Sequence, residues 1–167
     1  MAGKTNFTTD LEKGELSMKR LFDAPRELVF KAWSSCDHIS KWWGPRTYPT
    51  TFCEMDFRPG GTWRYCMTGP EGDQAWGKGV YSEIVEPERI AYRDYFTDAK
   101  GVESSELPSS AITVEFRQQN GQTELHSRTR YDSKEAMQQV IDMGVEEGFA
   151  ETLDRLEEYL ATQTARS

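Results

Sequence analysis

The chain has 167 residues, a formal net charge of −8 and 37% hydrophobic residues. This length is enough for one domain with a sizeable core, and the acidic balance argues against binding to nucleic acid or to anionic membranes. No apolar run reaches about 18 residues, so we expect no membrane insertion. We predict a single domain over residues 14–163, with a flexible leader at 1–13 and a tail at 164–167.

The first predicted elements are one strand and two short helices. Residues 15–22 alternate between apolar and polar side chains, which is typical of a half-buried strand. Asp23 is a candidate N-cap and Pro25 suits a first helical turn, so a short helix should follow. A second short helix is expected over residues 37–43, where a Gly-Pro pair ends it.

From residue 50 onward the hydrophobic period changes to two. Turn residues separate the alternating segments, and Asn120-Gly121 is the strongest hairpin signal in the chain. Consecutive hairpins predict an antiparallel meander whose apolar face needs a cover. The alternating segments are residues 53–57, 63–67, 76–85, 90–96, 112–116 and 123–131.

The last predicted element is one long amphipathic helix from Ser133 to Gln163, which is the element able to cover the sheet. The Ser133 hydroxyl is placed to cap its first turn. Gly144 and Gly148 interrupt the apolar stripe, and each costs about 1 kcal/mol relative to Ala in a helix interior. They allow either close packing of a neighbouring element or space for a ligand, and we favour space for a ligand.

The cysteine pattern is that of free thiols. Cys36, Cys53 and Cys66 are an odd number and lack a CxxC spacing, which argues against a disulfide framework or a zinc site. Free thiols suit a reducing compartment, and the N-terminus does not resemble a secretory signal. We therefore expect a cytoplasmic location.

Several motifs, in this order, resemble one known family. They are FDAPRELVFKAW (22–33), HISKWWGP (38–45), EMDFRPGGTWRY (54–65), GVYSEIVEPERIAY (79–92) and MGVEEGFAETLDRLEEYL (143–160). Over residues 15–162 the chain resembles the homologues of the activator of heat-shock protein 90 ATPase, within the SRPBCC superfamily of START-like proteins. The resemblance implies an α+β helix-grip fold, in which a seven-stranded antiparallel curved sheet wraps around a long C-terminal helix. It also implies two short helices between the first two strands and a cavity between sheet and helix.

The predicted ligand site is the wall of this cavity, which would be rich in Trp and Tyr. These side chains combine an apolar body with a polar group, which suits a mostly apolar pocket. For any single aromatic residue an ordinary core position is the alternative, but as a set they favour a cavity. The predicted cavity-lining residues are Trp43, Trp63, Tyr65, Met67, Trp76, Tyr81, Tyr92, Met137, Ile141, Gly144, Gly148 and Phe149.

The ionisable residues give no comparable pattern. His38 is expected on a solvated helix surface and His126 on the charged side of its strand, and neither has a partner at metal-binding spacing. Four strand carboxylates are expected in ion pairs on the outer face of the sheet, although burial would raise the pKa of any of them and suit it to acid–base chemistry. We expect no metal and no cofactor, and the catalytic residue is unknown. The four carboxylates are Glu54, Asp56, Glu83 and Asp94.

Three functions are compatible with these features. The leading hypothesis is a soluble protein, monomeric or weakly dimeric, that encloses a hydrophobic or aromatic small molecule of lipid-like or polyketide-like character. The family name implies an alternative partner, a chaperone, with this protein acting as a co-chaperone on heat-shock protein 90. The third hypothesis is a cyclase- or hydrolase-type enzyme, in which the cavity orients a substrate and a carboxylate moves protons.

Overall fold

The structure is a computed structural model that describes residues 5–164, and it combines one antiparallel sheet with four helices. The strands are β1 (Asn6–Asp10), β2 (Glu15–Phe22), β3 (Thr50–Met55), β4 (Thr62–Thr68), β5 (Gln74–Val85), β6 (Arg89–Thr97), β7 (Ser110–Gln119) and β8 (Gln122–Tyr131). They pair in the order β1-β2-β8-β7-β6-β5-β4-β3. Every strand therefore lies beside its sequence neighbours, except that β2 and β3 are far apart in the sheet.

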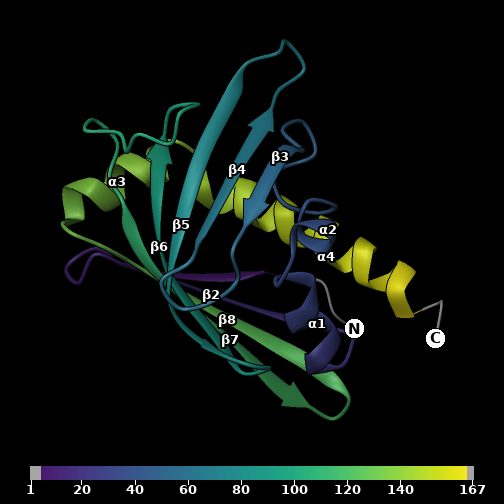
Figure 1. Ribbon diagram of the computed structural model, residues 1–167. Coiled ribbons are helices and arrows are strands. Elements are labelled where there is room, and N and C mark those ends of the chain that lie inside the picture. The colour runs from purple at the N-terminus through teal and green to yellow at the C-terminus, as the bar shows by residue number, and fades with distance from the viewer. Residues whose placement is uncertain (1–4, 165–167) are drawn as a thin grey trace.

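The helices are α1 (Arg26–Ala32), α2 (Cys36–Ile39), α3 (Lys134–Asp142) and α4 (Val145–Thr164). The first two occupy the long connection between β2 and β3. Figure 1 shows α4 running diagonally across the twisted sheet, with α3 near one end of it and α1 and α2 near the other. The predicted α+β architecture is confirmed, with eight strands in place of seven.

The core lies between the sheet and α4. Successive side chains of a strand point to opposite faces, so alternate residues of the sheet reach the core. Leu153, Leu156 and Leu160 recur at helical spacing on α4 and are at most 3% exposed. They belong to the same buried cluster as Phe22 and Phe116 of the sheet. Burying each such side chain contributes about 1.5–3 kcal/mol, which fixes α4 on the sheet.

Two local predictions from the sequence are confirmed. Asn120 and Gly121 adopt φ angles of 54° and 81°, and they join β7 to β8 with Gln119 opposite Gln122. Both residue types tolerate positive φ, which two-residue hairpins of this kind need. The Ser133 side chain accepts a hydrogen bond from the Ala136 N–H at 3.0 Å and caps α3.

The predicted flexible leader is wrong over residues 6–10. Residues 6–10 form β1, which pairs with β2 from Asn6 opposite Lys19 to Asp10 opposite Glu15. This strand lies at the edge of the sheet and is mostly exposed, so it lacks the apolar alternation that would have revealed it. Residues 1–4 of the predicted leader and 165–167 of the predicted tail lie outside the described residues.

The predicted single C-terminal helix is two helices. Gly144 separates α3 from α4 and has a φ of +85°, a conformation that side chains with a Cβ rarely adopt. Its amide donates to the carbonyl of Ile141 at 2.9 Å, and an added Cβ would meet nothing within 4 Å. Gly144 therefore ends α3 directly after its C-cap residue, and it does not create space inside a helix.

The prediction of three free thiols is wrong for two of them. Cys36 at the start of α2 and Cys53 in β3 form a disulfide, with 5.7 Å between their Cα atoms, while Cys66 is buried and free. The fold brings the two together because α2 packs against β3. The disulfide removes the argument for a reducing compartment that the cysteine pattern provided.

Candidate functional site

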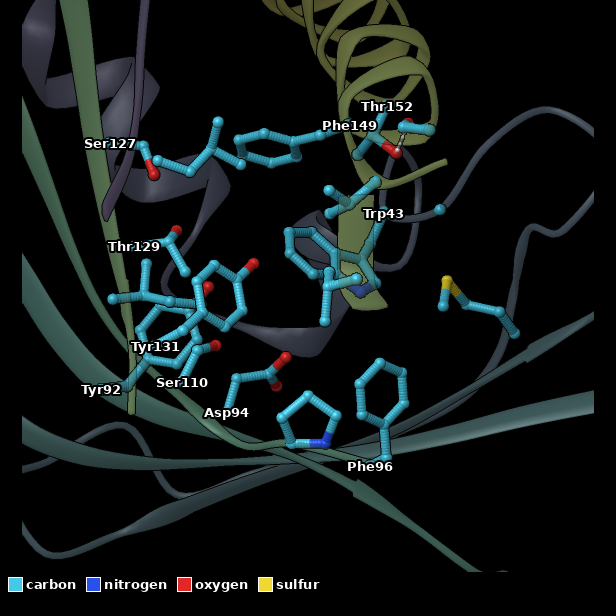
Figure 2. Close-up of a pocket in the computed structure, with 18 of the residues that line it drawn as sticks. Trp43, Tyr92, Asp94, Phe96, Ser110, Ser127, Thr129, Tyr131, Phe149 and Thr152 are labelled. Atoms are coloured by element: carbon cyan, nitrogen blue, oxygen red, sulfur yellow. Dashed lines mark hydrogen bonds between the residues drawn. The ribbon is translucent and has the colours of Figure 1, made fainter. Parts of the chain in front are cut away.

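A cavity of about 240 Å³ lies between the sheet and the first turns of α4, and it is partly open to solvent. Strands β6, β7 and β8 form one side of it, α3 and α4 another, and the Trp43–Pro45 connection a third. Figure 2 shows Asp94, Ser110 and Tyr131 on the side opposite Phe149 and Thr152. The lining residues are Leu16, Trp43, Gly44, Pro45, Met67, Tyr92, Asp94, Phe96, Pro108, Ser110, Ile112, Ser127, Thr129, Tyr131, Val140, Val145, Gly148, Phe149 and Thr152.

Five of the twelve residues predicted to line a cavity do so. They are Trp43, Met67, Tyr92, Gly148 and Phe149. Gly148 lies in the first turns of α4, where an added Cβ would come within 3.7 Å of the Pro45 ring on the facing wall. Of the two glycines that suggested space for a ligand, Gly148 is thus the one at the cavity.

Three predicted aromatic residues lie behind the wall instead of in it. Trp63, Tyr65 and Tyr81 are at most 6% exposed and belong to the main core. The Trp63 ring contacts the ring of Trp43 at a centroid distance of 4.7 Å and that of Tyr65 at 4.6 Å. Trp63 and Tyr65 support Trp43 from behind, and Tyr81 contacts the ring of Tyr92 at a centroid distance of 6.1 Å. These residues therefore affect the shape of the cavity without lining it.

Trp76 is on the opposite face of the sheet. Its ring contacts that of Phe52 in a tilted arrangement with a centroid distance of 5.4 Å, and the Arg64 guanidinium lies 5.9 Å from its ring. Trp76 pairs with Cys66 in the register between β4 and β5, whereas the inner-facing Tyr65 pairs with Gly77. The prediction of Trp76 as a cavity residue is wrong because it lies out of phase with the inner residues of β5.

The remaining three predicted residues belong to the region around α3. Met137 is fully buried in a second cluster, beside Tyr131 and Val140, and Ile141 packs against the same cluster. Gly144 ends α3 and is exposed. The prediction is wrong for these three because it assumed one unbroken helix facing the cavity along its whole length.

Two glycines of β5 set the position of the tyrosine rings at the site. An added Cβ on Gly77 would lie 2.3 Å from the Tyr65 ring, and one on Gly79 would lie 3.1 Å from the Tyr92 ring. A glycine inside a strand often marks such a close approach. The two rings therefore lie close to the backbone of β5, and the Tyr65 hydroxyl reaches the carboxylate of Asp94.

Asp94 places a carboxylate in a largely apolar cavity. The Tyr65 hydroxyl donates a hydrogen bond to Asp94 Oδ1 at 2.9 Å, while Oδ2 accepts none from the described residues. No Lys, Arg or His among residues 5–164 lies within ion-pair distance of it. Burial raises the pKa of Asp94 to about 7, and the hydrogen bond from Tyr65 opposes part of that rise.

The other strand carboxylates behave as predicted and Asp94 does not. Glu54, Asp56 and Glu83 form ion pairs with neighbouring arginines, at 3.9, 2.8 and 2.7 Å. The hydrogen bond and the charge of Arg89 lower the pKa of Glu83. The prediction of an outer ion pair is wrong for Asp94, which faces the cavity like Tyr92 two residues before it.

Several hydroxyl groups at the cavity are available to a bound molecule. Ser110, Ser127 and Thr129 line it from β7 and β8, and within residues 5–164 their side chains make no hydrogen bond. Tyr131 lines the same side, and burial together with the Asp94 charge raises its pKa to about 12. Tyr131 is therefore neutral at physiological pH, and its hydroxyl can donate or accept a hydrogen bond.

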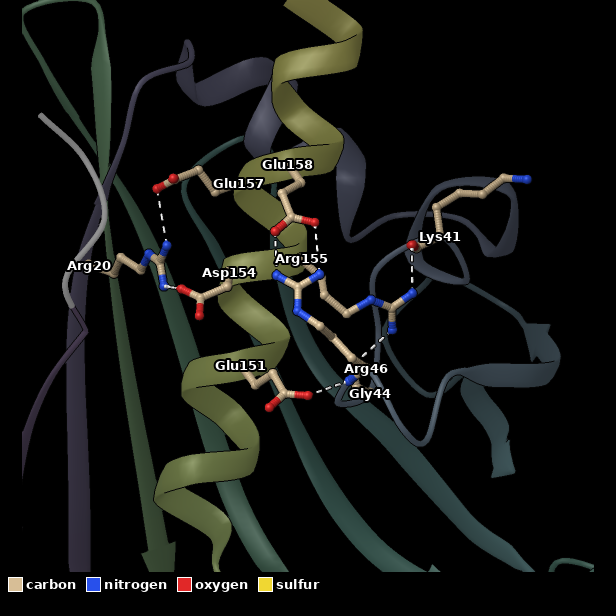
Figure 3. Close-up of polar contacts among 9 residues, drawn as sticks. All are labelled: Arg20, Lys41, Gly44, Arg46, Glu151, Asp154, Arg155, Glu157 and Glu158. Carbon is tan, nitrogen blue, oxygen red and sulfur yellow. Dashed lines mark hydrogen bonds and ion pairs between the residues drawn. The ribbon is translucent and has the colours of Figure 1, made fainter. Parts of the chain in front are cut away.

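The Trp43–Pro45 wall of the cavity is fastened to α4 by arginines (Figure 3). Arg155 donates to the carbonyl oxygens of Gly44 at 2.8 Å and Trp43 at 3.3 Å. Arg46 forms a two-point ion pair with Glu158, one turn further along the helix. These contacts hold Trp43 in place from outside the cavity.

A third arginine holds the other side of α4. Arg20 of β2 has a side chain that is 1% exposed, and it pairs with Asp154 at 2.7 Å and with Glu157 at 3.0 Å. Figure 3 shows Arg20 and Arg155 on opposite sides of the helix. The helix is therefore fixed to the sheet by apolar contacts below it and by ion pairs and hydrogen bonds at its flanks.

The two histidines are not at the cavity. His38 Nδ1 lies 2.6 Å from the Tyr159 hydroxyl, so it is a partner of α4 and not the solvated residue we predicted. His126 faces the charged side of β8, as predicted, and its Nε2 lies 2.6 Å from Glu124. The described residues contain no group of three or more His, Cys, Asp or Glu side chains that could hold a metal.

Fourteen lining residues were not predicted from the sequence, although some of them had a visible signal there. Asp94 and Phe96 are in phase with Ile90 and Tyr92 at a period of two, which places all four on one face of β6. The turn-side residues Pro45 and Pro108 had no such signal, because the sequence does not show how far a connection folds back over the sheet.

Comparisons with known proteins agree with this architecture. Residues 23–161 match the sequence profile of the family described as "Activator of Hsp90 ATPase homolog 1-like protein". No curated protein matches the chain. No helix within residues 5–164 has the length and apolar character needed to cross a membrane.

Solved structures extend the match over nearly the whole chain. A protein from Arthrobacter aurescens is 31% identical, with a TM-score of 0.89 over 94% of this chain and 91% of its own. A protein from Mycobacterium smegmatis is also 31% identical, with a TM-score of 0.85 over 92% and 94% of the two chains. The AHSA1 protein from Silicibacter pomeroyi, at 20% identity and a TM-score of 0.72 over 89% and 99%, shares the fold.

The family match covers residues 23–161, which include both short helices, β3 to β8 and the part of α4 that borders the cavity. Together with the two relatives at 31% identity, it confirms the resemblance that the sequence motifs indicated. The chain belongs to the Activator of Hsp90 ATPase homolog 1-like family.

Proposed function

We propose that this protein binds one compact hydrophobic or aromatic small molecule in the cavity between the sheet and α4. The observation that supports this most directly is the cavity itself, of about 240 Å³, with aromatic and aliphatic side chains over most of its wall. Binding pockets in proteins are typically apolar with a few polar groups that orient the ligand. The fold shared by this family commonly binds hydrophobic ligands.

The size of the cavity narrows the ligand class. An apolar protein cavity of about 150 Å³ holds one benzene molecule. The present cavity, at about 240 Å³, suits two fused rings or one ring with a short chain. A long acyl chain or a polyketide of four rings would need the walls to move apart, so we propose a smaller ligand than the sequence alone suggested.

A cavity-filling substitution tests this proposal. Gly148 lies at the cavity with normal helical geometry, so Gly148→Leu adds a side chain inside the cavity without straining α4. We expect it to abolish binding of a two-ring probe, 1-naphthylmethanol, measured by calorimetry, while thermal unfolding stays close to that of the wild type. Native mass spectrometry of freshly purified wild-type and Gly148→Leu protein would show whether a retained molecule disappears in parallel.

Gly148→Ala is the matched control. Its single methyl group makes an ordinary contact with Pro45 at 3.7 Å and leaves most of the cavity open. We expect it to retain probe binding within about threefold, which corresponds to less than about 1 kcal/mol. Equal probe affinity in wild type and Gly148→Leu would contradict the proposal.

Family membership favours a second candidate, a co-chaperone action on heat-shock protein 90. The test is the ATPase rate of the chaperone with and without the wild-type protein at micromolar concentration. An increase that persists in Gly148→Leu would assign this action to a surface separate from the cavity. No change in the rate would count against the candidate.

A further inference from the structure

Asp94 is the one charged side chain among the nineteen residues that line the cavity. Its Oδ1 accepts the hydrogen bond from Tyr65, and its Oδ2 has no partner among residues 5–164. Figure 2 shows the carboxylate directed into the space between Tyr131, Trp43 and Phe96. A carboxylate with an unused oxygen and no nearby cation is costly to bury, and a ligand that supplies the missing positive charge removes that cost.

The groups around Asp94 complement an ammonium ion. An alkylammonium has three N–H donors and needs three acceptors. The hydroxyls of Ser110, Thr129 and Tyr131 line the same side of the cavity as Asp94 and can supply acceptors in addition to Asp94 Oδ2. Aromatic faces attract cations as well, and Trp43 and Phe96 border the same space.

We propose that the cavity selects compact ring compounds that carry one protonated amino group. The ammonium would bind at Asp94 and the hydroxyls beside it, and the ring system would pack against Trp43 and Phe149. This inference rests on the proposed function, because it assumes that the cavity takes up a small molecule, and it adds the chemical class of that molecule.

The charge balance of the protein favours a cation over an anion. The net charge of −8 attracts cationic ligands and repels carboxylates, phosphates and sulfonates. Two arginines on elements that border the cavity, Arg93 of β6 and Arg155 of α4, have other partners. Arg93 turns away to Ser109 and Asp132, and Arg155 is bound to the carbonyls of Trp43 and Gly44. A ligand anion would therefore face Asp94 without a counter-charge.

Binding of an amine should depend on pH in one direction. The titratable groups that face Asp94 are Tyr65 from β4, Tyr92 from β6 and Tyr131 from β8, and burial raises the pKa of all three, so they stay neutral. Asp94 therefore controls the charge of the site. Amine affinity should rise as the pH increases through about 7, the pKa of Asp94, because an alkylamine remains protonated up to about pH 9.

Two probes of the same size and shape test the inference. They are 1-naphthylmethylamine, which is cationic, and 1-naphthylmethanol, which is neutral. We expect the wild type at pH 8 to bind the amine at least about tenfold more tightly than the alcohol, by calorimetry. The ratio of the two affinities should shrink as the pH falls towards 5.5, while the alcohol affinity stays nearly constant.

Asp94→Asn removes the charge at constant shape. We expect this variant to bind both probes with similar affinity, losing the preference for the amine and its pH dependence. Glu88→Gln is the control for net charge, because Glu88 is exposed and does not line the cavity. It should keep the wild-type ratio of amine affinity to alcohol affinity.

Tyr65→Phe deletes the hydrogen bond that lowers the pKa of Asp94, so the pH midpoint of amine binding should move upward.

The outcomes separate the two proposals. Alcohol binding as tight as amine binding in the wild type would overturn this inference and leave the proposed function standing. Equal losses for both probes in Asp94→Asn would also overturn it, since the residue would then act on the shape of the cavity. If the wild type binds neither probe, the proposed function fails and this inference fails with it.

Discussion

Asp94 makes the stability of this protein depend on pH in an unusual direction for a carboxylate. Its pKa is raised from an ordinary value near 3.8 to about 7, so the folded state holds a proton that the unfolded chain releases. The contribution of Asp94 to the free energy of unfolding therefore decreases as the pH rises from about 4 to about 7. A shift of this size corresponds to a few kcal/mol at most, since one pKa unit equals about 1.4 kcal/mol.

We predict that Asp94→Asn is more stable than the wild type at pH 8 and close to it at pH 4. Urea denaturation at both pH values measures the difference, and the variant-minus-wild-type comparison cancels the contributions of other acids. That cancellation matters because Arg89 and Arg46 lower the pKa of Glu83 and of Glu158. The contribution of these two carboxylates to the stability of the protein therefore decreases as the pH falls. Glu88→Gln should show no such pH-dependent difference. A constant gap between Asp94→Asn and wild type would contradict the prediction.

Asp94 and Trp76 also show how far strand periodicity predicts the direction of a single side chain. Asp94 lies two residues from Tyr92 and two from Phe96, so its inward direction followed from the same alternation that predicted β6. Trp76 lies five residues from Tyr81, an odd number, so an unbroken strand cannot point both inward. Its aromatic character suggested a cavity residue, but its phase within β5 decided its position.

At the scale of elements, β5 is the strand that shapes the site without lining it. Gly77 and Gly79 leave room for the rings of Tyr65 and Tyr92, which in turn border Asp94 and the cavity. Glycine weakens a strand because it adds backbone entropy to the unfolded state and contributes no packing. Here the missing side chains are replaced by tyrosine rings from β4 and β6.

We predict that Gly77→Ala displaces Tyr65 and lowers the free energy of unfolding by about 1–3 kcal/mol, the usual cost of overpacking. The added Cβ would lie 2.3 Å from the ring, so the hydrogen bond from Tyr65 to Asp94 should break. The pKa of Asp94, followed by NMR, should then rise further.

Gly79→Ala is the matched substitution on the same strand. Its closest contact would be 3.1 Å, to Cδ2 of Tyr92, so a small shift of that ring accommodates it. We expect a smaller loss of stability and a pKa of Asp94 near that of the wild type. A larger loss for Gly79→Ala than for Gly77→Ala would refute this account of β5.

The C-terminal helices show why element boundaries were harder to predict than element types. The apolar stripe continues through residues 137–160 because α3 and α4 both bury a face, and this continuity concealed the break. Gly144 was the visible signal, since glycine with positive φ commonly ends a helix. Glycine alone does not distinguish a helix end from a tolerated interior position, and the backbone angle decides between them.

At the scale of the whole molecule, a covalent link joins the helical connection to the sheet. The disulfide between Cys36 and Cys53 spans 17 residues of sequence, which include the Trp43–Pro45 wall of the cavity. Closing a loop of about 15 residues in the unfolded chain stabilises a protein by about 3 kcal/mol in the chain-entropy account. The sequence could not reveal this pairing, because it requires α2 to dock on β3.

We predict that reduction of the wild-type disulfide lowers the free energy of unfolding by about 2–4 kcal/mol. Denaturation with and without a reducing agent measures the effect. The double variant Cys36→Ser and Cys53→Ser should resemble the reduced wild type and should not respond to the reducing agent. A wild type whose unfolding is equally insensitive to the reducing agent would contradict the prediction.

Most of the fold was predictable because its signals are local. Alternation indicated the strands from β2 to β8, Asn120-Gly121 indicated the turn between β7 and β8, and Ser133 indicated the start of α3. The family motifs agreed with this order of elements. The cavity was only partly predictable. Its volume and its single carboxylate depend on how the connection between β2 and β3 folds over the strands, which is a property of the assembled molecule.

The fastening of that connection has a consequence for the rate at which molecules exchange with the cavity. Cys36 and Cys53 close the segment at its base, and Arg155 holds its middle by hydrogen bonds to the carbonyls of Trp43 and Gly44. Displacing the Trp43 wall must break these bonds, and the disulfide prevents the segment from peeling away at its ends. For a molecule that enters by this side, we therefore expect slow passage in both directions, which would lengthen its residence time without changing its affinity.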